Sequence, residues 1–81
     1  MNNDIKIGST VKLFYWRDKE IHDFVVRDIF FERYLYGYKT VIKAKYYSKK
    51  ADCSFVETYF VNDFFEAINK AKEADKEAEN E

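Results

Sequence analysis

The sequence predicts a mainly β protein of the α+β class, with four or five antiparallel strands in a small barrel or curved meander sheet and a C-terminal helix. Three observations support this fold class. Apolar and polar side chains alternate with the period of a strand between residues 10 and 60. Polar or glycine-containing turns interrupt the alternation, and the apolar spacing becomes helical after Asn62. The 81 residues suffice for one domain. We expect it to span residues 1–71, before an acidic helical tail over residues 72–81 that frays.

The first strand is predicted over TVKLFYW, residues 10–16, after a turn at Gly8 and Ser9. A polar turn over residues 17–20 ends it. Successive residues of a strand point to opposite faces. One face would therefore carry Val11, Leu13 and Tyr15, and the other Lys12, Phe14 and Trp16.

The second strand covers residues 21–36, and its apolar side changes near Asp28, which predicts a β-bulge or a sharp bend. Gly37, the only glycine in the chain interior, marks a tight turn. The third strand follows over YKTVIKAKYY, residues 38–47. Its core-like face is expected to carry Tyr38, Thr40, Ile42, Ala44 and Tyr46, and its basic outer face Lys39, Val41, Lys43, Lys45 and Tyr47.

A turn over residues 48–52 leads to the fourth strand, CSFVETYFV. Asn62 is then the expected N-cap of the helix, with Asp63 in its first turn. Phe64, Phe65, Ile68 and Ala71 recur at helical spacing, so they should dock the helix on the sheet.

The segments IKIGSTVKL, VVRDI and FVNDFFEAI resemble the SH3-like small β-barrels, which include KOW and Tudor-type modules. Such modules begin with a turn before a strand and often end with a short helical turn after the fourth strand. The resemblance covers about residues 5–68. It implies the fold alone, because the glycine that KOW modules place between strands is absent here and the helix is longer.

The composition indicates a protein of a reducing compartment. Cys53 is the only cysteine, so a disulfide scaffold is excluded. No apolar run approaches the length of a membrane span, and the first ten residues lack the pattern of a signal peptide. We therefore expect a cytoplasmic protein, in the host cytoplasm if a phage encodes it.

The residues that catalysis or metal binding would need are scarce, which predicts a protein that is not an enzyme. His22 stands beside Asp23, but neighbouring strand residues face opposite ways. Cys53 could act as a nucleophile only if the fold brought it to His22, and no local signature accompanies it. No metal-ligand spacing and no glycine-rich phosphate loop is found. We expect no catalytic residue, no metal and no cofactor.

Two kinds of surface remain as candidates for binding. The first is a nucleic-acid interface on the third strand and its turn, where lysines would meet phosphates and a ring would stack on bases. The simpler interpretation is that these lysines protect an exposed strand from edge-to-edge pairing. The lysines are Lys39, Lys43, Lys45, Lys49 and Lys50.

The second candidate is an aromatic protein interface, because sixteen rings exceed what a core of this size readily buries. Tyr, Trp and Arg are the usual anchors of protein interfaces. The alternative is that both faces of the sheet are covered and the rings are core. The interface candidates are Phe14, Trp16, Arg17, Arg33, Tyr34, Tyr36, Tyr38 and Tyr47.

Together these observations favour a small binding module that acts through protein–protein interaction, with a host protein or a second copy as partner. Phe, Tyr, Ile, Lys and Asn make up 37 of the 81 residues, which indicates an AT-rich genome. We therefore expect a phage or mobile-element accessory protein that inhibits or redirects a host enzyme or defence complex. The alternatives are a module that binds single-stranded DNA or RNA and a homo-oligomeric structural subunit. No membrane partner is expected.

Overall fold

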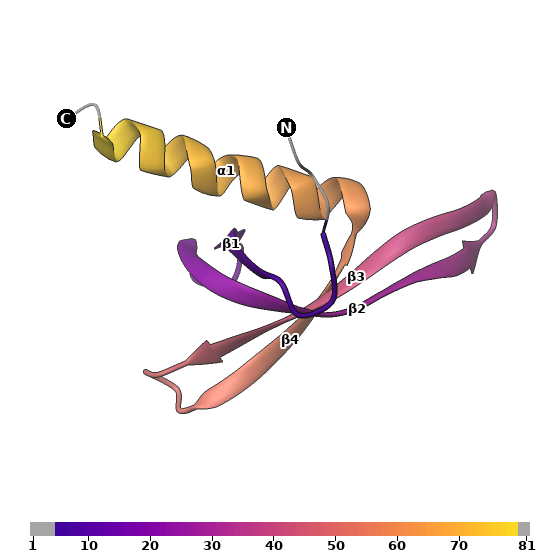
Figure 1. Cartoon of the computed structure of the whole chain (residues 1–81), viewed down its shortest axis with the longest axis horizontal. Helices are drawn as coiled ribbons and strands as arrows, with labels where there is room; N and C mark the ends of the chain where they lie inside the picture. The colour runs from indigo at the N-terminus through magenta and orange to yellow at the C-terminus, as the bar shows by residue number, and fades with distance from the viewer. Residues whose placement is uncertain (1–4, 80–81) are drawn as a thin grey trace.

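The computed structural model describes residues 5–79 of the chain, with side chains as far as residue 74. It consists of β1 (Thr10–Tyr15), β2 (Glu20–Tyr34), β3 (Gly37–Ser48), β4 (Cys53–Phe60) and α1 (Val61–Glu79) (Figure 1). The strands form one antiparallel sheet in the order β1-β2-β3-β4. The mainly β, α+β class is thus confirmed. Among residues 5–79 the sheet is open, so the chain adopts the curved meander form. The resemblance to SH3-like barrels stays a prediction.

A register shift in β2 occurs where the sequence predicts the bulge. β2 pairs with β3 through Val26 opposite Ala44 and then through Asp28 opposite Lys43, so Arg27 is the extra residue. Before the shift, the buried Val26 faces the core. After it, Ile29 packs against that same core. The bulge therefore changes which sequence parity faces inward, as expected.

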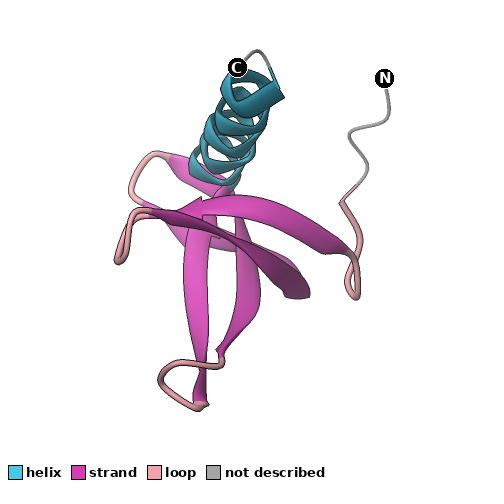
Figure 2. Cartoon of the chain, turned by 90° about the vertical axis from the view of Figure 1, so that its left-hand side faces the viewer, coloured by secondary structure: helices cyan, strands magenta, loops and turns pink. Residues whose placement is uncertain are grey.

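The core lies between the inner face of the sheet and α1, which crosses the sheet on one side (Figure 2). Phe64 of the helix is fully buried, and its ring lies 5.6 Å from that of Tyr59. The predicted docking of the helix through Phe64 and Ala71 is confirmed, because both are buried. The main cluster consists of Leu13, Tyr15, Phe24, Val26, Ile42, Ala44, Tyr59, Phe64 and Ala67.

β2 and β3 form a long hairpin that extends beyond the rest of the sheet (Figure 1). β1 pairs with β2 only as far as Val25, and β4 pairs with β3 only from Val41 onward. Residues 31–40 therefore form a two-stranded ribbon. Its turn consists of Leu35 and Tyr36, followed by Gly37 with a φ of 126°. A positive φ is the reason for a glycine here.

Two details differ from the expectations. The helix begins at Val61, so Asn62 lies in its first turn and is not the N-cap. The reason is that β4 pairs as far as Phe60, opposite Val41, and continues directly into the helix. Val41, expected on an exposed basic face, is fully buried because its cross-strand neighbours Phe30 and Phe60 flank it.

The division of the chain at residue 71 stays a prediction, and burial along the described helix side chains ends there. Ala71 is buried, and Lys72, Glu73 and Ala74 are exposed. The helix continues to Glu79. Fraying of the tail stays a prediction, and residues 80–81 lie outside the described part of the chain.

Candidate functional site

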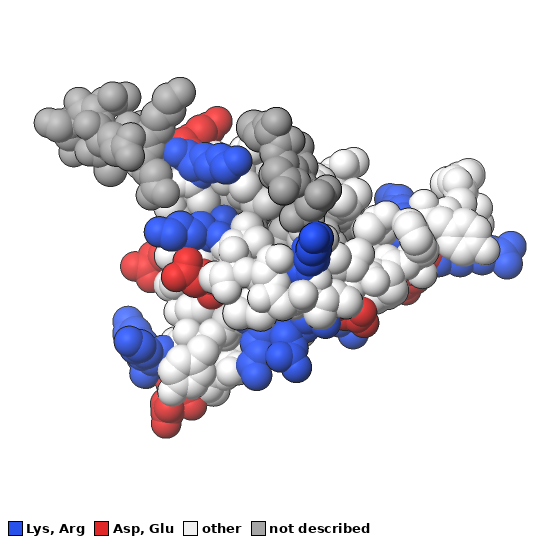
Figure 3. Space-filling model, in the orientation of Figure 1, with Lys and Arg blue, Asp and Glu red and all other residues white. Residues whose placement is uncertain are grey.

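The projecting hairpin carries the four most exposed large apolar side chains of the described residues. Phe31 is 76% exposed, Leu35 87%, Tyr36 97% and Tyr38 72%. We call these four residues the hairpin patch. Arg33, also exposed, is the cross-strand partner of Tyr38. In Figure 3 the projecting end of the molecule shows a large uncharged surface with basic side chains at its margin.

The patch results from the bulge and from the length of the hairpin. After the bulge, Ile29 and Phe31 continue the inward face of β2. Ile29 lies close enough to the core to pack against it. Phe31, one inward position further along, lies beyond the core and is left exposed. Tyr36, Tyr38 and Arg33 were predicted from the sequence as interface residues, whereas Phe31 and Leu35 were not. The change of parity near Asp28 was the signal that could have identified Phe31.

Tyr34 belongs to a covered cluster on the opposite face of the hairpin. Its half-buried ring lies 5.2 Å from that of Phe60. Its hydroxyl donates to Glu32 at 3.2 Å. Lys39 covers this cluster, with its Nζ 4.7 Å from the centre of the Phe60 ring. Tyr34 therefore supports the hairpin and is not an open contact residue.

The remaining ring candidates lie away from the hairpin patch. Trp16 is exposed in the β1–β2 turn, at the opposite end of β2, and the Arg17 guanidinium lies 4.3 Å from its ring centre. Phe14, which is half-buried, helps to line a shallow cavity of about 200 Å³ against α1 with Trp16. Tyr47 is exposed near the β3–β4 turn, where its hydroxyl donates to Asp52 at 2.6 Å. The predicted aromatic interface thus separates into three places.

The predicted lysines separate into two groups. Lys45, Lys49 and Lys50 line a groove of about 720 Å³, and Arg27, the extra residue of the bulge, joins them. The acidic residues Glu20 and Asp23 and the ring of Tyr47 line the same groove. Figure 3 shows basic side chains gathered along the lower surface of the sheet. Four cations therefore line this one concave surface.

Lys39 and Lys43 lie outside this groove, over aromatic rings. Lys43 places its Nζ 5.8 Å from the centre of the Phe30 ring. Both lysines stand opposite acids of β2, Lys39 at Glu32 and Lys43 at Asp28. Cross-strand neighbours of opposite charge favour a sheet, so the positions of these two lysines suit the pairing of β2 with β3.

A hydrogen-bonded triad links β1, its turn and β4. Both the Tyr15 hydroxyl and the Arg17 Nε donate to Oε2 of Glu57, the latter at 2.6 Å. The Glu57 side chain is only 12% exposed. Burial alone would raise the pKa of Glu57, but the hydrogen bonds from Arg17 and Tyr15 and the charge of Arg17 outweigh it and lower that pKa. Burial, followed by the bond to Glu57, raises the pKa of Tyr15.

Glu57→Gln is therefore expected to lower the free energy of unfolding at neutral pH by about 1–2 kcal/mol. The folded-state pKa of Glu57 lies below the ordinary value of 4.5, so its contribution is present above pH 4.5 and is lost as the pH falls through the depressed pKa. Urea unfolding at several pH values would test this. The wild type should lose more stability on acidification than the variant. Glu66→Gln, at an exposed position of α1, is the control and should follow the wild type.

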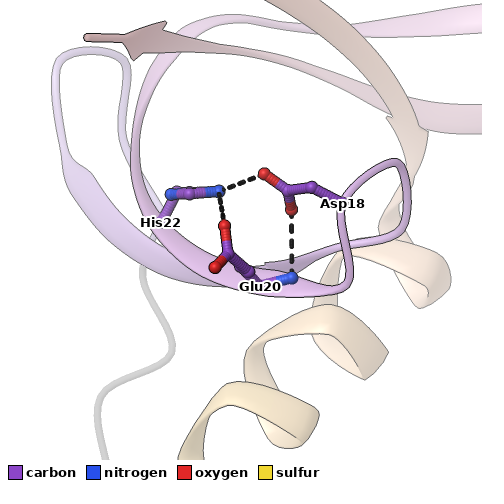
Figure 4. A group of neighbouring side chains, drawn as sticks. All are labelled: Asp18, Glu20 and His22. Carbon is purple, nitrogen blue, oxygen red and sulfur yellow. Dashed lines mark hydrogen bonds and ion pairs between the residues drawn. The ribbon is translucent and has the colours of Figure 1, made fainter. Parts of the chain in front are cut away.

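A second polar cluster lies in the β1–β2 turn. Nε2 of His22 lies 2.6 Å from Asp18 Oδ2 and 3.9 Å from Glu20 Oε2 (Figure 4). The His22 ring also stacks on Tyr46, with 4.0 Å between the ring centres. The partner of His22 is thus Asp18 rather than its sequence neighbour Asp23.

The three side chains of this cluster bring potential metal ligands together. One ligand atom from each of Asp18, Glu20 and His22 lies within 4.8 Å of the others. Imidazole and carboxylate groups are ligand types of divalent transition metals. Their spacing in the sequence does not indicate a metal site, because these residues converge only through the turn, where Lys19 adopts a φ of 58°. The contacts among these three residues are also explained without a metal, as hydrogen bonds that stabilise the turn.

Comparison of the chain with protein-family models, with curated proteins and with solved structures finds no match. Within residues 5–79, α1 is the one helix, and it is not apolar enough to cross a membrane.

Proposed function

We propose that the protein is a non-enzymatic binding module that acts through protein–protein interaction, with the β2–β3 hairpin as its binding element. The observation that supports this most strongly is the hairpin patch. A two-stranded ribbon outside a folded core is only marginally stable in isolation. Exposed Phe, Leu and Tyr side chains on such a ribbon gain the most from burial against another protein.

The composition of the hairpin supports a protein partner rather than a nucleic acid. Tyr36 and Tyr38 combine a large apolar ring with a hydroxyl that remains available for hydrogen bonds. Arg33 opposite Tyr38 adds a planar donor group. Aromatic residues with Arg are enriched in protein interfaces. Residue usage further supports an AT-rich origin, so we propose a phage or mobile-element accessory protein that inhibits or redirects a host protein.

Affinity capture from a lysate of a low-GC bacterium, performed at low and at high salt, tests this function. An apolar interface should keep a near-stoichiometric protein partner at both salt concentrations, because burial of apolar surface does not depend on counterion release. Recovery of no protein partner from the lysate, together with no self-association of the chain, would contradict the proposal. So would recovery only at low salt together with nucleic acid.

A second candidate function is the binding of single-stranded nucleic acid in the groove lined by Arg27, Lys45, Lys49 and Lys50. It is supported by the convergence of these cations beside the exposed ring of Tyr47. Glu20 and Asp23 in the same groove weaken the positive field and make this function second to the hairpin.

If the groove binds an oligonucleotide, the affinity should fall steeply with salt, by about 0.7 in log–log slope for each phosphate contacted. Lys49→Glu with Lys50→Glu should weaken binding severalfold. Lys6→Glu, at an exposed lysine before β1 and outside the groove, is the control and should bind like the wild type. Fluorescence anisotropy with a labelled oligonucleotide would measure all three. Equal loss in the control would show that the groove is not the site.

A further inference from the structure

The β2 strand has a free edge along the projecting hairpin. β1 pairs with β2 as far as Val25, and Gly8 and Ser9 add backbone hydrogen bonds to Val26. Among the described residues, β2 from residue 27 to Tyr34 then has β3 as its only neighbour. The chain contains no proline that would block this edge. A free strand edge offers backbone donors and acceptors to another strand.

We propose that this edge pairs with the same edge of a second copy of the chain, in antiparallel orientation and with Phe31 opposite Phe31. The proposal rests on the proposed function of the hairpin as a protein-binding element and names its partner. The result is a symmetric dimer in which the two sheets become one continuous sheet. Two-fold symmetric contacts of this kind use the same surface on both copies.

The charges of β2 select this register. In an antiparallel pair, residues that lie opposite each other point to the same face of the sheet. When the two strands are related by a two-fold axis, one residue at the axis must therefore lie opposite the same residue of the second copy. With Phe30 at the axis, Asp28 of each copy would lie opposite Glu32 of the other copy. With Glu32 at the axis, two glutamates would face each other. Like charges directly opposite destabilise a sheet.

Placing Phe31 at the axis avoids these conflicts. Ile29 then lies opposite Arg33 and Phe30 opposite Glu32, so no like charges are paired. The acids of this segment already have cations as cross-strand neighbours in β3, since Asp28 pairs with Lys43 and Glu32 with Lys39. Placing Ile29 at the axis would extend the pairing into the part of β2 that β1 already occupies.

The side chains fit this arrangement. Phe31 is 76% exposed in the single chain, so pairing would bring two exposed rings together across the axis. Aromatic pairs are among the favourable cross-strand pairs of a sheet. In Figure 1, α1 lies over the other end of the sheet and leaves the outer part of the hairpin open. A second copy therefore buries the exposed ring and the free backbone edge at once.

Symmetric cross-linking tests the register. Phe31→Cys in a Cys53→Ser background should form a disulfide-linked dimer on mild oxidation, because directly opposite strand residues have Cα atoms about 4.5–5.5 Å apart, within disulfide reach. Tyr38→Cys in the same background is the control. Tyr38 is also exposed, but it lies on β3, with β2 between it and the edge. It should therefore cross-link far less.

A charge exchange at the same position tests the dimer without a covalent bond. Light scattering should give twice the mass of one chain for the wild type. Phe31→Lys and Phe31→Glu should each give the mass of one chain, because like charges would meet at the axis. An equimolar mixture of the two variants should recover the doubled mass. Val56→Lys, at an exposed position on β4, should leave the dimer intact.

The outcomes separate this inference from the proposed function. A wild-type chain that stays monomeric at all concentrations, or a Phe31→Lys variant that stays dimeric, would overturn the edge dimer. If the chain is monomeric but its hairpin still captures another protein, the proposed function stands and only the identity of the partner changes. If it is monomeric and captures nothing, both fail.

Discussion

Phe64→Ala is expected to lower the free energy of unfolding by about 3–5 kcal/mol, a large part of the stability of a small domain. Phe64 is fully buried. The ring of Tyr59 lies edge-on to the ring of Phe64, with 5.6 Å between the ring centres. The other buried helix residues are Ala67 and Ala71, which bury little area. Truncation at Phe64 would leave a cavity and remove the main anchor of α1.

Urea unfolding followed by far-ultraviolet circular dichroism would measure this effect. Phe65→Ala is the matched control, since Phe65 is the same residue type on the next position of the helix but is only half-buried. Its loss should be clearly smaller. Equal losses for the two variants would mean that Phe64 does not fix the helix to the sheet.

The second large effect is expected on binding and not on stability. Replacement of Phe31, Leu35 and Tyr36 together by serine should weaken the partner complex by about 30-fold or more, since an interface anchor contributes about 2 kcal/mol or more. The melting temperature should change little, because all three side chains are exposed and surface substitutions usually have small effects. Binding would be measured by titration, with thermal unfolding on the same samples.

Val56→Ser is the control for this triple variant, because Val56 is an exposed apolar residue on β4, outside the hairpin. It should bind like the wild type. If the triple variant also binds like the wild type, the hairpin patch is not the interface. If it unfolds, these side chains stabilise the fold of the single chain and do not act only in binding.

Local pattern was enough to predict most of the fold. The alternation around Leu13 placed β1, the change of parity at Asp28 predicted the bulge, and Gly37 marked the hairpin turn. These features depend on residues that are close in sequence. The helix starts at Val61, two positions before the Asp63 that an N-cap at Asn62 implies, because the pairing of β4 with β3 determines where the strand ends.

The exposed surface was harder to predict, because exposure depends on how far each neighbouring element extends. Nothing near Phe31 in the sequence shows that β1 stops pairing at Val25 and leaves the outer hairpin uncovered. Arg27 comes beside Lys45, Lys49 and Lys50 only through the pairing of β2 with β3, which places these distant residues along one groove. The convergence of Asp18 and His22 likewise depends on the backbone of a turn.

The most direct test of the hairpin as the binding element is backbone hydrogen exchange over residues 27–38, measured in the free chain and in the complex, whether with a second copy or with another protein. In the free chain the amides of residues 31–38 should exchange readily, because the ribbon has few contacts beyond its own strands. In the complex their exchange should slow more than that of any other segment. Unchanged exchange over residues 27–38, with protection elsewhere, would contradict the central claim.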